Sequence, residues 1–124
     1  KDILVLGLAF KPETDDIRES IAIDIINYLI EENVNVFAHD PIAINKMQKF
    51  LGHIRNITYI SKWEGYLEKI DAVIILTKWN TYNSLSEQSN KDKLKNKVII
   101  DPRRQFAPAE FKDSKYLTIG RRLK

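Results

Sequence analysis

Short, almost entirely apolar runs alternate along the chain with segments whose apolar residues recur every three or four positions. Such runs are typical of strands buried on both faces of a parallel sheet, because a strand with one exposed face shows alternating polar residues. We predict strands at residues 3–9, 34–38, 57–60, 72–76, 98–100 and 116–119.

The segments between the first strands have the spacing of amphipathic helices. Apolar residues at positions 21, 22, 25, 26, 29 and 30 share one helical face, and further helices are predicted at 44–51 and 63–70. Asn33 and Gly52 stand where a residue of left-handed conformation often ends a helix. The alternation predicts an α/β fold: a doubly wound, mostly parallel sheet of five to six strands with helices on both faces.

Length and composition limit the function classes. With 124 residues, 44% of them hydrophobic, residues 1–124 are expected to form a single domain. The sequence shows neither a membrane span nor a signal peptide, so we expect a cytoplasmic protein without a membrane partner. The 20 basic and 17 acidic residues are interspersed, which argues against a nucleic-acid partner. Because the chain opens on a strand without Met, we expect it to be a fragment of a larger protein.

A ligand in such a sheet binds beyond the carboxyl ends of the strands, which places the candidate site in the loops at 10–20, 77–80 and 101–104. Only Gly7 is present where a dinucleotide fingerprint needs three glycines. Lys11 and Arg18 offer another means of holding phosphate. The alternative is that Asp15 or Asp16 caps the helix while Arg18 pairs with a surface carboxylate.

The remaining candidates are open to two interpretations. Arg103 and Arg104 follow a strand, where a guanidinium can stack on a base or bind phosphate, or they form a solvated basic pair. Trp79 is expected to pack over the end of the sheet. His39 and His53 lack the spacing of a metal site, and the absence of Cys excludes a thiolate nucleophile or a thiolate metal ligand.

Several motifs resemble the carboxyl-terminal UDP-binding domain of the UDP-glucose/GDP-mannose dehydrogenase family, in particular that of UDP-glucose 6-dehydrogenases. They occur in the family's order at residues 7–20 (GLAFKPETDDIRES), 39–41 (HDP), 76–80 (LTKWN), 100–103 (IDPR) and 116–121 (YLTIGR). The chain departs from the family's pattern at Ile21, at Asn33, and at Lys78, where Glu is usual.

The resemblance implies a Rossmann-like domain of an NAD-dependent oxidoreductase that converts UDP-glucose to UDP-glucuronate in two steps for polysaccharide biosynthesis. It implies that Phe10, Lys11 and Arg103 bind the UDP-sugar and that Arg18 reaches the pyrophosphate of NAD. It also implies that an amino-terminal domain binds most of the NAD and carries the catalytic Cys, in a homo-oligomeric parent enzyme. No catalytic residue is therefore expected in this chain, and no metal.

Three alternatives remain. Dehydrogenases of UDP-N-acetylhexosamines or of GDP-mannose share the architecture. A phosphoacceptor receiver domain would use Asp15, Asp16 and Thr77, but the third strand is followed by Ser61 instead of an Asp, and the fifth loop lacks the expected Lys. The last alternative is a free-standing nucleotide-binding module.

Overall fold

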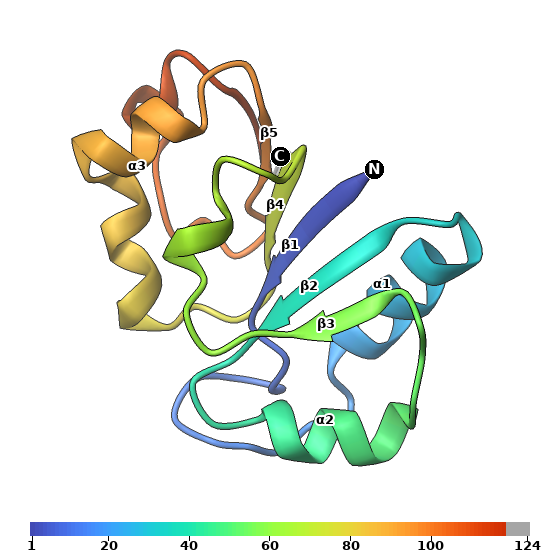
Figure 1. Cartoon of the computed structure of the whole chain (residues 1–124). Helices are drawn as coiled ribbons and strands as arrows, with labels where there is room; N and C mark the ends of the chain where they lie inside the picture. The colour runs from blue at the N-terminus through green and yellow to red at the C-terminus, as the bar shows by residue number, and fades with distance from the viewer. Residues whose placement is uncertain (119–124) are drawn as a thin grey trace, which may run out of the picture.

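Six parallel strands form one sheet in the order β3-β2-β1-β4-β5-β6 (Figure 1). The architecture comes from a computed structural model, which describes residues 1–118. The strands are β1 (Asp2–Leu6), β2 (Asn35–His39), β3 (Ile57–Tyr59), β4 (Ala72–Ile75), β5 (Val98–Ile100) and β6 (Lys115–Leu117). The predicted doubly wound sheet is thus confirmed, and all its strand pairs are parallel.

The strand order reverses between β1 and β4. The chain moves outward from β1 to β2 and β3, then crosses to the other side of β1 and moves outward again through β4, β5 and β6. Because the connections leave these two central strands in opposite directions, a crevice opens beyond their carboxyl ends. This is where a ligand of such a sheet binds.

Helices cover both faces of the sheet (Figure 1). The helices α1 (Ile21–Glu31) and α2 (Ile44–Leu51) lie on one face. The other face is covered by η1 (Glu64–Tyr66), η2 (Asn80–Ser86), α3 (Gln88–Lys93) and η3 (Pro108–Phe111), of which the η segments are 3₁₀ helices.

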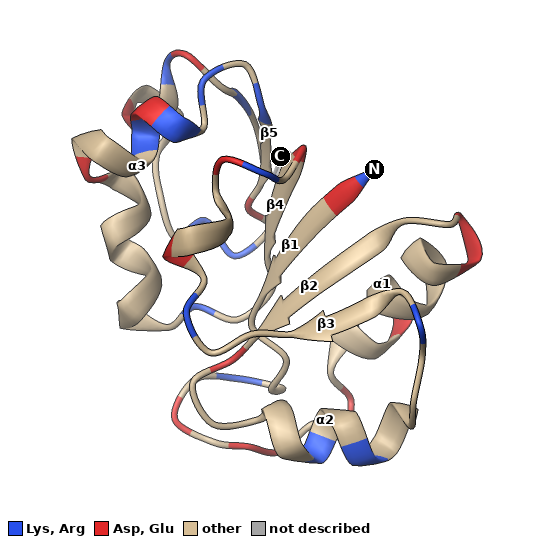
Figure 2. Ribbon diagram, in the orientation of Figure 1, with Lys and Arg blue, Asp and Glu red and all other residues tan. Residues whose placement is uncertain are grey.

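Alternate side chains of the central strand enter separate cores on the two faces. Leu4 and Leu6 belong to the core under η1, η2 and η3, whereas Val5 packs with Ala22 and Ile26 of α1. Charged residues are interspersed over helices and loops, while the inner strands carry almost none (Figure 2). The near-continuous apolar runs of the sequence therefore reflect burial on both faces.

The ends of α1 show which cap the sequence uses. Ser20 is the N-cap: its Oγ accepts a hydrogen bond from the backbone N–H of Ala22 (3.1 Å) and donates one to the Leu8 carbonyl (2.8 Å). The alternative that Asp15 or Asp16 caps this helix is therefore wrong. At the other end Asn33 has φ +61°, and the N–H groups of Asn33 and Val34 bond back to Ile30 and Leu29, so the predicted left-handed cap is confirmed.

Other elements differ from the expectation in detail. The helix predicted at 63–70 is the 3₁₀ helix η1, and η2 and α3 occupy residues 80–93, where no helix was predicted. That segment has few apolar residues, so its sequence shows no helical period. The last strand begins one residue early, at Lys115, and its predicted end at Ile119 lies outside the described residues. No helix within residues 1–118 has the length and apolar content needed to span a bilayer.

Gly7 directly follows β1 and packs against Thr77 in the loop after β4. Its φ is +102°, and a Cβ atom placed on it would lie 2.4 Å from the backbone nitrogen of Thr77. Both the conformation and the space therefore require glycine here.

We expect Gly7→Ala to destabilise the fold by about 3 kcal/mol, because it adds overpacking to an unfavourable backbone conformation. Chemical denaturation measures the loss. Gly65→Ala is the control, since no atom lies within 4 Å of the added Cβ, and it should change stability by less than about 0.5 kcal/mol. Equal stability of the two variants would contradict the role assigned to Gly7.

Candidate functional site

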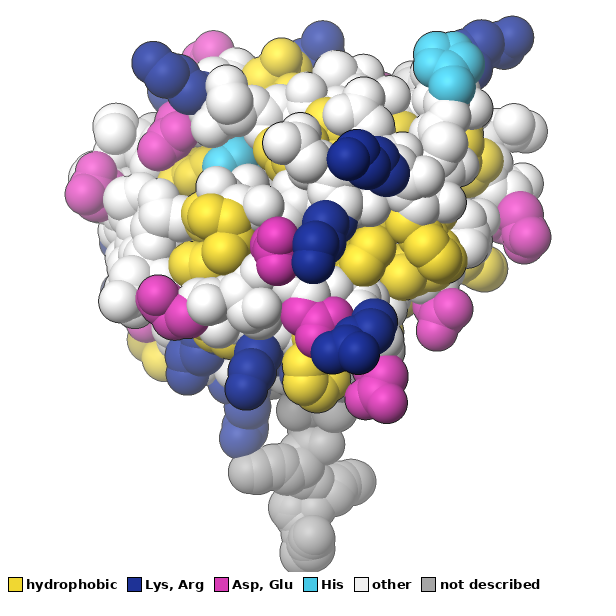
Figure 3. Space-filling view, turned by 90° about the horizontal axis from the view of Figure 1, so that it is seen from below, with side chains coloured by type: hydrophobic (Ala, Val, Ile, Leu, Met, Phe, Trp, Pro, Cys, Tyr) yellow, Lys and Arg dark blue, Asp and Glu magenta, His cyan; other side chains and the backbone are white. Residues whose placement is uncertain are grey.

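Two hollows lie side by side at the carboxyl ends of the central strands, with Phe10 lining both. On this face, basic side chains lie next to exposed hydrophobic ones (Figure 3). The first, which we call the basic hollow, has a volume of about 100 Å³ and is lined by residues 10–12 and 76–78 and by Arg103. It thus brings together three of the four predicted site residues: Phe10, Lys11 and Arg103.

Arg103 is positioned by its own backbone loop and by β4. Its Nε donates a hydrogen bond to the Leu76 carbonyl (2.7 Å), while its terminal nitrogens bond to none of residues 1–118. The preceding Asp101 is buried and accepts the N–H groups of Gln105 (3.0 Å) and Phe106 (2.9 Å). This loop therefore holds the guanidinium at the rim of the hollow with its outer edge available to an anion.

The Asp101 carboxylate also fixes the end of β6. It accepts a hydrogen bond from the Tyr116 hydroxyl, which lies 2.9 Å from the Phe106 carbonyl as well. Burial and the neighbouring Asp101 raise the pKa of Tyr116, so this hydroxyl stays protonated and remains a donor.

Hydrogen bonds fix the loop that carries Phe10 and Lys11 at two points. Thr77 Oγ1 donates to the Ala9 carbonyl (2.8 Å), and the Phe10 N–H donates to the Asp16 carbonyl (2.7 Å). Phe10 is 44% exposed, although it sits in a fixed loop. Its ring is therefore presented to solvent at the edge of the hollow.

Asp40, which follows β2, holds the loop after β1 and the turn before α2 through hydrogen bonds. It is 2% exposed. One carboxylate oxygen accepts the N–H groups of Leu8 (2.8 Å) and Ala9 (3.1 Å), and the other accepts those of Ile42 and Ala43 (both 2.9 Å). In the sequence Asp40 stands out only as part of a motif, because Leu8 and Ala9 are distant from it along the chain.

Trp79 packs over the end of the sheet, as expected. Its side chain is buried, and its Nε1 donates to the Asp40 carboxylate at 3.3 Å. The indole therefore fixes the β4 loop and is not presented to a ligand.

Arg18 lines the second hollow, of about 320 Å³, together with Phe10, Asp16 and Glu19. Its guanidinium forms a two-point contact with Asp16 (Nε–Oδ1 3.1 Å, terminal nitrogen–Oδ2 2.9 Å), and the Arg18 side chain is 88% exposed. This hydrogen bonding lowers the pKa of the Asp16 carboxyl to about 2 and raises that of Arg18. Pairing with a surface carboxylate, one of the two alternatives, is thus what the structure shows.

The structure separates the two neighbouring arginines and adds one residue. Arg103 lines the basic hollow, whereas Arg104 has φ +58° and does not. Lys78, which lies in the predicted site loop at 77–80 but was not among the predicted site residues, lines it too. Its position after β4 was the available signal, because the carboxyl ends of neighbouring parallel strands converge.

The histidines do not form a metal site. His39 is buried, with Nδ1 2.9 Å from the Tyr82 hydroxyl, and His53 lies beyond α2 beside β3. Within the described part of the chain, no group of three His, Cys, Asp or Glu side chains could hold a metal ion.

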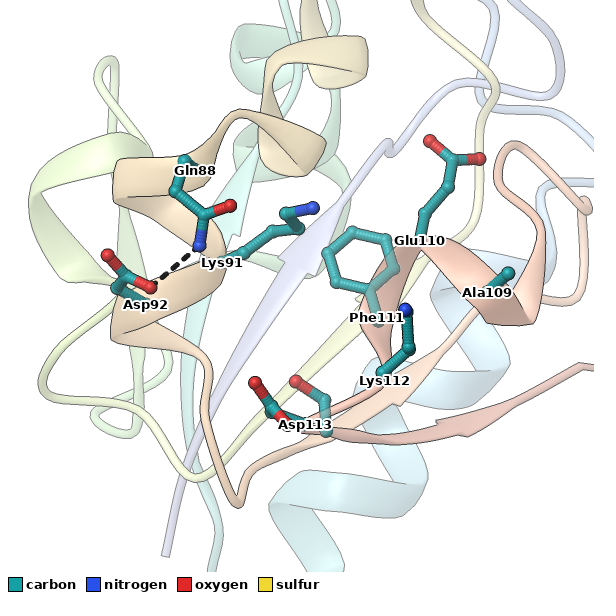
Figure 4. A pocket seen from close by; sticks show the side chains of 9 residues that line it. Gln88, Lys91, Asp92, Ala109, Glu110, Phe111, Lys112 and Asp113 are labelled. Carbon is teal, nitrogen blue, oxygen red and sulfur yellow. Dashed lines mark hydrogen bonds between the residues drawn. The ribbon is translucent and has the colours of Figure 1, made fainter.

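Another hollow, of about 370 Å³, lies between α3 and η3 (Figure 4). Its lining mixes both signs of charge, with Lys91 and Lys112 beside Asp92, Glu110 and Asp113. These residues precede β5 and β6, so the hollow lies toward the amino ends of the strands, away from the crevice. None of the predicted site residues lines it.

The strand order and the basic hollow at its reversal point define a Rossmann-like nucleotide-binding domain. Residues 4–108 match the UDP-binding domain of the UDP-glucose/GDP-mannose dehydrogenase family. The chain belongs to this family.

The chain is also similar to individual dehydrogenases over nearly its whole length. The chain is 39% identical over 123 residues to the UDP-glucose 6-dehydrogenase TuaD of Bacillus subtilis, covering 98% of this chain and 26% of that protein. A UDP-glucose dehydrogenase from Pyrobaculum islandicum has a TM-score of 0.72 at 32% identity, over 97% of this chain and 25% of that one. An NDP-N-acetyl-D-galactosaminuronic acid dehydrogenase from Methanosarcina mazei has a TM-score of 0.78 at 26% identity. The match covers 98% of this chain and 25% of that one. The chain therefore spans about a quarter of the length of these relatives.

His39 gives stability a pH dependence, which we predict from its burial. Burial lowers the pKa of His39 below 6.5, against the opposing effects of Asp40, Glu64 and the Ser61 backbone. Below pH 6.5 the unfolded chain therefore binds a proton that the folded ring resists. The contribution of the buried, neutral His39 ring to the stability of the fold is complete above pH 6.5. It is lost as the pH falls toward the lower pKa that His39 has in the folded state.

We expect the melting temperature to fall between pH 6.5 and 5 in the unmodified chain and to fall less in His39→Gln, which cannot titrate there. Thermal unfolding followed by circular dichroism measures both. His53→Gln, which alters an exposed histidine, should keep the full decline. The same decline in His39→Gln would assign the effect to other groups.

Proposed function

We propose that the basic hollow binds the diphosphate of a UDP-sugar and that the chain is the UDP-binding part of a longer, NAD-dependent UDP-glucose 6-dehydrogenase. That enzyme would oxidise UDP-glucose to UDP-glucuronate in two steps. The observation that carries the proposal is the convergence of Lys11 and Arg103 on one hollow at the reversal point of the sheet.

The side chains suit a nucleotide diphosphate. Arg103 is held through Nε, so its terminal nitrogens can donate to phosphate oxygens, and Lys11 adds a compact charge beside it. The exposed ring of Phe10 offers an apolar face against which a base or a sugar ring can pack. Such a site binds and orients a ligand.

Catalysis and most of the NAD binding would belong to a separate domain. The chain has no Cys to form a covalent intermediate. Its one glycine at the end of β1 faces Thr77, so the absent side chain makes room for a neighbouring loop and not for a pyrophosphate. We therefore propose that the active site forms only when an NAD-binding domain covers this edge.

We expect Lys11→Ala and Arg103→Ala each to weaken UDP binding by at least about tenfold, since each removes a charge-assisted hydrogen bond of about 1.5–3 kcal/mol. Calorimetric titration of the chain with UDP measures the change. Arg104→Ala is the matched control, because Arg104 is also exposed but does not line the hollow. Unchanged affinity in both test variants would refute the site, and tighter binding of GDP than of UDP would favour a GDP-mannose dehydrogenase.

For Arg18 we propose a contact to the pyrophosphate of an NAD bound across the cleft. Its guanidinium is almost fully exposed, and Asp16 holds it by one edge, which leaves the other edge available. Asp16 would in this arrangement orient the guanidinium toward the facing domain.

In the full-length dehydrogenase, Arg18→Ala should raise the KM for NAD by about tenfold, equivalent to about 1.4 kcal/mol, and should leave the KM for the UDP-sugar unchanged. Steady-state kinetics with each substrate varied in turn measure both values. Arg55→Ala removes an exposed arginine from the loop before β3 and serves as the control. A rise in the KM for the UDP-sugar alone would indicate that Arg18 contacts the UDP-sugar and not NAD.

A further inference from the structure

Lys78 is held at the basic hollow by its two neighbours. Thr77 and Trp79 are both buried, and the Trp79 N–H donates to the Thr77 carbonyl at 3.0 Å. Thr77 bonds to the β1 loop and Trp79 to Asp40, as described above. The backbone at position 78 is therefore fixed, while the Lys78 side chain is exposed on the lining of the hollow.

The side chains that line the basic hollow are cationic or uncharged. Its lining holds three cations, Lys11, Lys78 and Arg103, and no carboxylate among residues 1–118. In the adjoining loop, Asp15 pairs with Lys46 at 3.3 Å and Asp16 pairs with Arg18.

The buried carboxylates nearby are engaged as well. Asp40 accepts five hydrogen bonds and Asp101 accepts three, all from groups that hold the loops together. Three positive charges line a space of about 100 Å³ whose lining holds no carboxylate, which favours a multivalent anion there.

We propose that Lys78 is a ligand-binding residue, whose ammonium group completes a three-cation cradle for the diphosphate with Lys11 and Arg103. The inference rests on the proposed function. A lysine stem of four carbons is long enough to reach the centre of a hollow of this size from its rim, and an ammonium group donates to phosphate oxygens without a fixed direction. Lys78 would set the charge selectivity of the site, favouring diphosphates over uncharged nucleosides.

The test titrates the 124-residue chain with UDP and with uridine, followed by NMR chemical shifts. At about 0.05 M salt, Lys78→Met should weaken UDP binding about threefold and Lys78→Glu at least about tenfold, because the first removes an attraction and the second adds a repulsion. Both effects should shrink at about 1 M salt, where the Debye length is about 3 Å. Uridine, which carries no phosphate, should bind all variants equally.

Lys95→Glu is the matched control, because it makes the same change in net charge at an exposed lysine outside the hollow. It should leave the affinity for UDP unchanged. Three outcomes would overturn the role of Lys78. UDP could bind as weakly to Lys95→Glu as to Lys78→Glu, or the Lys78 variants could lose as much affinity for uridine as for UDP. The third is an unchanged affinity of Lys78→Glu for UDP. Failure of the unmodified chain to bind UDP would instead refute the proposed function, so the two failures are distinguishable.

Discussion

The Asp40 carboxylate receives N–H groups from three segments that are far apart in sequence: the loop after β1, the turn before α2 and the indole of Trp79 after β4. A carboxylate buried to this extent is stable only when its oxygens are satisfied by donors, and here five donors surround it. Removing it would leave four buried donors without a partner. The positions of two of the loops that line the basic hollow, those after β1 and β4, therefore depend on this one side chain.

Gly7 imposes the complementary constraint. The Asp40 bonds draw the β1 loop toward the sheet, and only a residue without Cβ lets the β4 loop come as close as Thr77 does. The Thr77 hydroxyl then bonds to the Ala9 carbonyl and closes the connection. Lys11 and Lys78 extend from the two sides of this closed connection, so their closeness follows from backbone packing and not from any attraction between them.

Local patterns predicted the fold better than they predicted the site. The strands and the caps at Asn33 and Gly52 were predictable because hydrophobic period and left-handed conformation are properties of a few consecutive residues. The residues 80–93 were not, since a short polar helix has no period to detect. Family motifs indicated Phe10, Lys11 and Arg103, and the structure brings these three together.

Several of the interactions that could not be read from the sequence join distant segments. Three of the five bonds of Asp40 link residues 31 to 39 positions apart, and no local pattern specifies such partners. The pairing of Arg18 with Asp16 is local, yet sequence could not choose it over an Arg18 that holds phosphate, because an exposed arginine suits either role. The place of Lys78 beside Lys11 required the strand order β1-β4, which only the assembled sheet provides.

Backbone strain is concentrated in the loops of the candidate site. Glu13, Glu19 and Arg104 have φ values of +70°, +61° and +58°, a region that non-glycine residues enter at a cost of about 1–3 kcal/mol each. Hydrogen bonds hold these loops in place, among them Phe10 N–H to Asp16, Ser20 N–H to Ile17 and Arg104 N–H to Asp101. Because the folded state already bears this cost, a ligand would meet loops that need little further ordering, and more of its contact energy would remain as affinity.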